Sequence, residues 1–139
     1  MAGGGKVSAV SLAGKKIVLY VYPKDDTSGC TMEAEAFRDL DDAFAASGAV
    51  VLGLSRDSVA SHEKFKAKHA LAFPLVSDES GAMCQALGVW VQKSMYGKRY
   101  MGIERTTFLI DEPDVFRRVW RKVKVPGHAA EVLAAAQAL

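Results

Sequence analysis

The stretch from Ile17 to Leu40, IVLYVYPKDDTSGCTMEAEAFRDL, constrains the fold of this chain more than any other. It opens on Ile17–Tyr22, an unbroken run of aliphatic, β-branched and aromatic residues that is typical of a buried strand. Pro23 ends the run, because proline cannot donate a hydrogen bond to a central ladder. A polar loop then delivers Cys30 to the start of a segment in which apolar residues recur at helical spacing. The sequence therefore predicts a strand, a short loop and a helix that begins beside the strand's carboxyl end.

Cys30 carries the most reactive side chain of this stretch. We expect it within the first turn of the helix, where unpaired backbone N–H groups and the positive end of the helix dipole favour an anion. A thiol in that position should be ionised near neutral pH and act as a nucleophile. The alternative is a buried, inert cysteine, which the polar, glycine-bearing loop before it disfavours.

Composition limits the remaining possibilities. The chain has 139 residues, which we assign to one domain, residues 1–139. A net charge of +2 gives no strong attraction to nucleic acid or to a membrane surface. No apolar run reaches the ~18 residues of a membrane span, and residues 1–16 lack the apolar region of a signal peptide. Two cysteines without a CxxC motif indicate reduced thiols, and hence a cytoplasmic protein with no disulfide framework.

The other periodic segments predict an alternation of strands and helices. Strands are expected at Val50–Ser55 and Phe73–Val76, followed by a hairpin of Thr106–Asp111 and Phe116–Val123 around Glu112–Asp114. Helices are expected over Cys30–Ser47, from Asp57 or Ser58 to His69, over Gly81–Leu87, and from Gly127 or His128 onward. Val89–Arg99 is expected to be irregular, with a turn at Tyr96–Lys98. This order predicts an α/β fold with a central mixed sheet flanked by helices, and reactive residues beyond the carboxyl ends of its strands.

The N-terminal residues are expected to contribute little. Three successive glycines carry high backbone entropy, so we expect residues 1–14 to be partly flexible. Within them, Lys6–Leu12 alternates loosely and predicts a short edge strand.

Several motifs resemble one known family. The spacing Pro23-xxx-Thr27-xx-Cys30 resembles the peroxiredoxin signature. The stretches YPKDDTSGCT, VLGLSRDS, FPLVSD and MYGKRYMGIERTTFLID are similar to its PrxQ subfamily, also called the bacterioferritin comigratory proteins (BCP). The resemblance runs from about Lys15 to the C-terminus. It implies a thioredoxin-like fold, no cofactor, and an antioxidant thiol peroxidase that reduces hydrogen peroxide and organic hydroperoxides through a sulfenic acid on the peroxidatic Cys30.

The residues before Cys30 suit that chemistry. Thr27 can donate its hydroxyl to one peroxide oxygen and accept from the other. Backbone N–H groups near Gly29 and Cys30 can stabilise charge on the departing oxygen. Pro23 can shield the thiolate from water.

Two charged residues complete the candidate site. Arg105 resembles the family's arginine, whose fixed fork suits a thiolate and a peroxide together; a surface arginine is the alternative. Glu33 lies one turn inside the predicted helix and is a supporting candidate that steadies the arginine or the N-terminal amides. A solvated helix face is the alternative for Glu33.

The sequence departs from the family at two places. Many relatives carry a second cysteine five residues after the first, where this chain has Glu35. Relatives also have an N-terminal hairpin before the turn at Gly14, and we expect it to be truncated here. The only other sulfur that could resolve a sulfenic acid is Cys84, and its helical context predicts a buried structural residue instead. We therefore expect an external thiol reductant, namely a thioredoxin, a glutaredoxin or glutathione.

Other features favour no further function. His62, His69 and His128 show no metal-binding spacing, so no metal is expected. The basic run Arg117–Lys124 is better explained as a solvated strand face than as a nucleic-acid site. Trp90 and Tyr96 are expected to pack or to rim the site. We expect a monomer or weak homodimer; a redox-responsive binding or holdase-like protein that uses the same cysteine is the alternative function.

Overall fold

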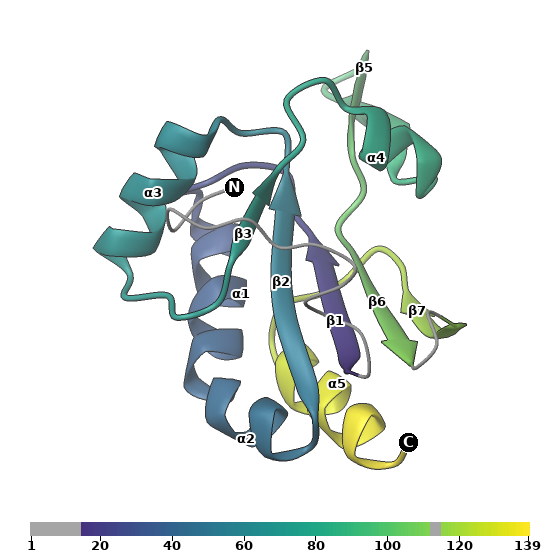
Figure 1. Cartoon of the computed structure of the whole chain (residues 1–139). Helices are drawn as coiled ribbons and strands as arrows, with labels where there is room; N and C mark the ends of the chain where they lie inside the picture. The colour runs from purple at the N-terminus through teal and green to yellow at the C-terminus, as the bar shows by residue number, and fades with distance from the viewer. Residues whose placement is uncertain (1–14, 112–114) are drawn as a thin grey trace.

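The structure is a computed structural model that describes residues 15–111 and 115–139 (Figure 1). In chain order its elements are β1 (Lys16–Val21), α1 (Ser28–Asp39), α2 (Asp41–Ala46), β2 (Ala49–Ser55), α3 (Val59–Lys68), β3 (Leu75–Ser77), α4 (Ala82–Ala86), β4 (Trp90–Met95), β5 (Lys98–Ile103), β6 (Thr106–Asp111), β7 (Val115–Trp120) and α5 (His128–Gln137). The expected hairpin turn at 112–114, the edge strand at 6–12, the flexibility of residues 1–14 and the truncated hairpin all fall outside the described residues.

The central sheet has the strand order β3-β2-β1-β6-β7. β1 pairs in parallel with β2, and β2 with β3, whereas β6 pairs antiparallel with both β1 and β7. The predicted mixed sheet is therefore confirmed. Thr106–Asp111 is a strand with the bounds that the sequence predicted.

Alternate residues of β1 supply two separate hydrophobic cores, as the two-residue period of a strand requires. Val18 and Tyr20 belong to the first core, together with residues of α1, α2, α3 and α5. Leu19 and Val21 belong to the second core, together with residues of α4, β5 and β6. In Figure 1, α1 and α3 lie to the left of β2, whereas α4 and β5 lie at the upper right, above β6.

The single helix expected over Cys30–Ser47 is wrong, because the chain turns at Leu40 and forms α1 and α2 instead. Asp41 and Asp42 occupy the first turn of α2, where acidic side chains favour the start of a helix. Phe37 and Phe44, on the two sides of the turn, contact each other in one core, with ring centroids 5.8 Å apart. Gly48 follows α2 with a φ of 82°, as expected of a residue that ends a helix.

The irregular structure expected over Val89–Arg99 is also wrong, although the turn expected at Tyr96–Lys98 is present at Tyr96 and Gly97. β4 and β5 pair there as an antiparallel hairpin, and both turn residues, Tyr96 and Gly97, have positive φ, 52° and 77°. Positive φ at both positions is the type I′ geometry that suits two-residue hairpins. Most of the hairpin is exposed, so its sequence carries little hydrophobic alternation. Tyr96 is 98% exposed and does not pack against the protein.

The remaining helices begin as the sequence predicted. Ser58 caps α3, and its side chain accepts a hydrogen bond of 3.1 Å from the backbone N–H of Ser61. Gly127 precedes α5. Among the described residues, no helix combines the length and apolar character that a membrane span needs.

Candidate active site

Cys30 is the third residue of α1, so it lies in the first turn of the helix, close to the carboxyl end of β1. Its side chain is buried in the first core, with 1% of its surface exposed. Thr27 is the N-cap residue and has an extended backbone. Its side chain makes no capping hydrogen bond, so the free N–H groups of the first turn are not satisfied by that hydroxyl.

Arg105 links Cys30 to Glu33. One terminal nitrogen of the guanidinium, Nη2, donates to Sγ of Cys30 at 3.3 Å. The other, Nη1, donates to Oε1 of Glu33 at 2.6 Å. Arg105 lies between β5 and β6, far along the chain from α1. The surface alternative for Arg105 is therefore wrong, since its side chain is 17% exposed and bound on both sides.

Gly29 leaves room for this arrangement. A Cβ atom at this position would lie 3.2 Å from Nη2 of Arg105, tighter than an ordinary van der Waals contact. The absence of a side chain at Gly29 thus lets the guanidinium approach the sulfur.

Glu33 is buried, with 1% exposure, so the alternative of a solvated helix face is wrong. Burial raises the pKa of Glu33 to about 7, although the positive charge of Arg105 acts in the opposite direction. Oε2 of Glu33 has no hydrogen-bond partner among the described residues. The cost of burying the carboxylate is therefore only partly offset by Arg105.

The other two candidates, Pro23 and Thr27, make no hydrogen bond to the sulfur of Cys30 in the described part of the chain. Pro23 is half-buried and lies two residues after Val21, the last residue of β1. The Thr27 hydroxyl is exposed and donates to the backbone carbonyl of Lys24 at 2.9 Å. That hydroxyl oxygen keeps its acceptor capacity for another donor.

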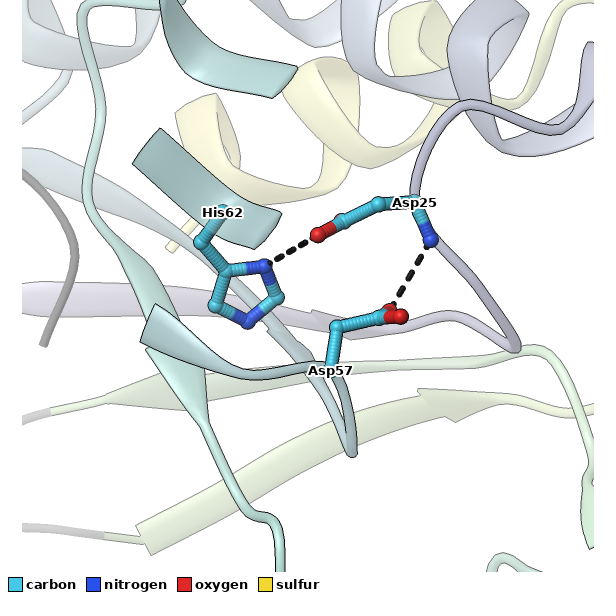
Figure 2. Close-up of side chains that lie close together, drawn as sticks. All are labelled: Asp25, Asp57 and His62. Carbon is cyan, nitrogen blue, oxygen red and sulfur yellow. Dashed lines mark hydrogen bonds and ion pairs between the residues drawn. The ribbon is translucent and has the colours of Figure 1, made fainter. Parts of the chain in front are cut away.

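A buried polar network holds the loop that leads to Cys30 (Figure 2). The carboxylate of Asp25 accepts from the hydroxyls of Tyr22 at 2.6 Å and Ser61 at 2.9 Å, and lies 2.7 Å from Nδ1 of His62. The backbone N–H of Asp25 donates to Asp57 at 2.9 Å. Sequence reasoning missed this network, because its members come from three separate segments and follow no spacing rule. It fixes the loop against α3 and the end of β2.

Asp25, Asp57 and His62 also form the one cluster of potential metal ligands found among the described residues, with ligand atoms within 4.8 Å of one another. Their ligand atoms already take part in hydrogen bonds within the protein. Nε2 of His62 lies 3.0 Å from the carbonyl of Val76, and a hydroxyl of Ser55 donates to Asp57 at 2.6 Å. A cation would have to displace these partners, so the chemistry of the cluster fits a structural brace better than a metal site.

Cys84 lies in α4, in the second core, and is fully buried as its sequence context predicted. Burial, together with the nearby carboxylate of Asp78, raises the pKa of Cys84 to about 12. Asp78 also accepts from the backbone N–H of Cys84 at 2.9 Å. The two cysteines therefore belong to different cores, separated by the central sheet, and Cys84 stays protonated at neutral pH.

Comparisons with known proteins show the family to which this chain belongs. The sequence profile of the AhpC/TSA family matches residues 1–119. Peroxiredoxin Bcp of Bacillus subtilis is 51% identical over 94% of this chain and 83% of its own length. Peroxiredoxin Bcp of Xanthomonas campestris pv. campestris is 50% identical over 99% of this chain and 86% of its own length.

A solved structure confirms the thioredoxin-like fold that the resemblance implied. The bacterioferritin comigratory protein of Xanthomonas campestris, which was trapped in intermediate and ligand complexes that bear on its alkyl peroxide reduction, matches with a TM-score of 0.93 at 50% identity. The match covers 99% of this chain and 87% of that one. The chain therefore belongs to the AhpC/TSA family and, within it, to the PrxQ/Bcp peroxiredoxins.

Proposed function

We propose that Cys30 is the peroxidatic cysteine of this protein. Membership of the peroxiredoxins makes the chain a cysteine-based thiol peroxidase. The observation that carries the assignment to Cys30 is the hydrogen bond of 3.3 Å from Nη2 of Arg105 to Sγ. The guanidinium can donate this hydrogen bond to a thiolate sulfur, and the thiolate is the nucleophile in this chemistry.

The proposed reaction begins when the Cys30 thiolate attacks one oxygen of the peroxide. A sulfur–oxygen bond forms, the oxygen–oxygen bond breaks, and the second oxygen leaves with the electron pair and takes up a proton. The products are Cys30–SOH and an alcohol, or water when the substrate is hydrogen peroxide. Arg105 donates to the sulfur, and Cys30 lies in the first turn of α1, so the guanidinium and the free N–H groups of that turn can stabilise charge that moves onto the leaving oxygen.

Thr27 and Pro23 are proposed to complete the peroxide site. Thr27 lies exposed at the start of α1, where its hydroxyl can turn from the Lys24 carbonyl toward a bound peroxide. Pro23 lies half-buried at the end of β1, where it limits access of water to the sulfur. Glu33 and Gly29 act on Arg105, the first by pairing with it and the second by leaving it room.

The sulfenic acid is proposed to be resolved by an external thiol. Cys84 lies in a different core, and burial with Asp78 keeps it protonated, so it is a poor nucleophile. The second cysteine that many relatives carry in the first helix is replaced by Glu35. A thioredoxin, a glutaredoxin or glutathione would then supply the electrons for each cycle.

The proposed substrates are hydrogen peroxide and organic hydroperoxides. Support for the organic substrates comes from the Xanthomonas campestris protein, whose alkyl peroxide reduction is the subject of its trapped complexes. We place this antioxidant activity in the cytoplasm, with no membrane or nucleic-acid partner and as a monomer or weak homodimer. The two unpaired cysteines support a reducing compartment.

The test compares Cys30→Ser with Cys84→Ser in a peroxide-consumption assay with an excess of a small thiol. Cys30→Ser should lose all turnover and keep its folded structure, because the hydroxyl is similar in size but does not ionise near neutral pH. Cys84→Ser should keep most of the turnover. Substantial peroxide consumption by Cys30→Ser would contradict the assignment. Repeated turnover by the wild type would also separate the enzyme from a redox-responsive binding protein, which would oxidise once.

A further inference from the structure

A pocket of about 310 Å³ lies against the outer side of Arg105 and has no part in the attack on peroxide described above. It is lined by residues 91–93 of β4, by residues 104 and 105, and by residues 122 and 123 after β7. Arg105 is therefore shared between this pocket and the sulfur of Cys30, which lies 3.3 Å from its guanidinium. The guanidinium of Arg105 would therefore lie between a molecule bound in the pocket and the reacting sulfur of Cys30.

Lys93 supplies one positive charge to the pocket. Its aliphatic stem lies over Gly102 of the neighbouring strand, where a Cβ atom would approach Cδ of Lys93 to 3.3 Å. Burial and the positive charge of Arg105 lower the pKa of Lys93, while Cys30 and Glu104 act in the opposite direction. The ammonium group is thus within electrostatic reach of the active site.

Lys122 supplies a second positive charge from a constrained backbone. Its φ is 48°, a left-handed conformation that is uncommon for a residue with a side chain. The next residue, Val123, donates its backbone N–H to the carbonyl of Arg105 at 3.0 Å. This hydrogen bond fixes the segment that carries Lys122 beside the arginine.

The charges of the pocket are not balanced. Its one carboxylate, Glu104, is already paired with Arg121 at 2.9 Å, and Arg105 is paired with Glu33. Among the described residues, neither Lys93 nor Lys122 has an ion-pair partner. Two lysines without an ion-pair partner therefore line one pocket, and their ammonium groups are suited to a carboxylate, which can accept hydrogen bonds from both.

We propose that this pocket is a carboxylate subsite for the thiol that reduces Cys30–SOH, and that the reductant it fits is a small thiol carrying a carboxylate. The proposal rests on the function proposed above. The protein needs such a thiol once per peroxide, because Cys84 lies in the other core. Hydrogen peroxide itself carries no charge, so an unbalanced positive pocket is of more use to an anionic thiol than to that substrate.

The step that the subsite serves is balanced with thiols alone. The thiolate of the reductant attacks Sγ of Cys30–SOH, a sulfur–sulfur bond forms, the sulfur–oxygen bond breaks, and hydroxide leaves and takes up a proton to become water. A second thiolate attacks the reductant's sulfur in the mixed disulfide and releases the Cys30 thiolate. Two thiols are oxidised to one disulfide, and Cys30 is reduced.

The experiment measures how fast two thiols of similar size reduce Cys30–SOH. The protein is oxidised with one equivalent of hydrogen peroxide and mixed with mercaptopropionate or mercaptoethanol at equal thiolate concentration, and the remaining sulfenic acid is trapped and quantified by mass. We expect mercaptopropionate to react about fivefold faster at low salt, and the ratio to shrink at about 0.5 M salt as the charges are screened. The ratio of the two rates on one sample cancels any loss of folded protein.

Single substitutions test whether the rate ratio of the two thiols depends on the residues of the pocket. Lys93→Gln and Lys122→Gln should each lower the ratio by about two- to threefold. Gly102→Ala should also lower it, because it displaces Lys93 without removing its charge. Lys98→Gln removes an exposed charge from the same hairpin, outside the pocket, and should leave the ratio unchanged.

Each remaining result overturns the proposal. A ratio near one in the wild type, or a ratio that both lysine variants leave unchanged, would show that the pocket does not select the thiol. A lysine effect confined to the oxidation step, measured with a carboxylate-bearing alkyl hydroperoxide against tert-butyl hydroperoxide, would assign the subsite to the peroxide instead. Failure of hydrogen peroxide to oxidise Cys30 would overturn the proposed function as well as the subsite. The other results would overturn the subsite alone, so the failure of one proposal can be told from the failure of the other.

Discussion

Replacing Arg105 with lysine tests the contact between the guanidinium and the sulfur. Arginine reaches Glu33 with Nη1 and Cys30 with Nη2, at 2.6 and 3.3 Å. A lysine ammonium is a point charge without this fork, so it cannot keep both bonds in the same geometry. Because the Glu33 carboxylate is almost fully buried, we expect the lysine to stay with Glu33 and to lose the sulfur.

The size of the effect follows from the bond that is lost. A hydrogen bond to a charged group contributes about 1.5–3 kcal/mol. If that bond is made to the thiolate and strengthens in the transition state, its loss corresponds to an about 10- to 150-fold decrease in the second-order rate constant for peroxide. The free energy of unfolding should fall by only about 1 kcal/mol, less than the roughly 3–5 kcal/mol expected when a buried charge loses its partner completely.

The assay is a single-turnover reaction with peroxide in which unreacted Cys30 is alkylated at timed intervals and counted by mass. Arg38→Lys is the matched control, since Arg38 lies in α1, the helix that carries Cys30 and Glu33, and it too pairs with acidic residues, Glu35 at 3.6 Å and Asp39 at 3.0 Å. The control should keep the wild-type rate. A rate for Arg105→Lys within about twofold of the wild type would refute the role given to the sulfur contact.

Three further predictions concern Glu33, Asp25 and Cys84. Burial raises the pKa of Glu33 from 4.5 to about 7, so the folded state binds the proton more tightly than the unfolded chain does. The protonated side chain therefore contributes its full stability at a pH below the pKa of the unfolded chain. That contribution is lost as the pH rises through the pKa of the folded state. Relative to Glu33→Gln, the wild type should therefore lose up to about 3 kcal/mol of unfolding free energy between about pH 4.5 and about pH 7, measured by urea denaturation; a constant difference would contradict the burial argument. Asp25→Asn breaks the buried pair with His62 and should lower the free energy of unfolding by about 3 kcal/mol in the same assay, whereas an unchanged midpoint would mean that the network does not hold the loop. Because the pKa of Cys84 is raised to about 12, an alkylating reagent at neutral pH should label Cys30 and leave Cys84 free in the folded protein, and rapid labelling of Cys84 would show that α4 opens.

The strands of the central sheet were predictable because their signal is local. Ile17–Tyr22 is continuous in apolar residues, since β1 is central and buried on both faces. The break at Leu40 was not predictable from periodicity, because the apolar spacing of the sequence continues through it. The β4–β5 hairpin was not predicted because it is mostly exposed, so its strands lack the alternation of apolar and polar residues that marks a half-buried strand.

The candidate site also contains residues that the sequence could predict and residues that it could not. Cys30 and its place at a helix start follow from neighbouring residues alone. Arg105 lies 75 positions away, and only its resemblance to the family's arginine singled it out before the structure placed it beside the sulfur. Nothing in the sequence joins Asp25 to His62, because a buried network depends on tertiary contacts between segments without a shared period.

The most direct test that Cys30 is the peroxidatic cysteine and is reduced by an external thiol is the mass of the protein after one equivalent of peroxide, with and without a sulfenic-acid trap, followed by peptide mapping. We predict a trapped adduct on Cys30 and an unmodified Cys84. A monomer two protons lighter that contains a Cys30–Cys84 disulfide would contradict the proposed reduction by an external thiol. An adduct on Cys84 with Cys30 unmodified would contradict the assignment of Cys30 as the peroxidatic cysteine.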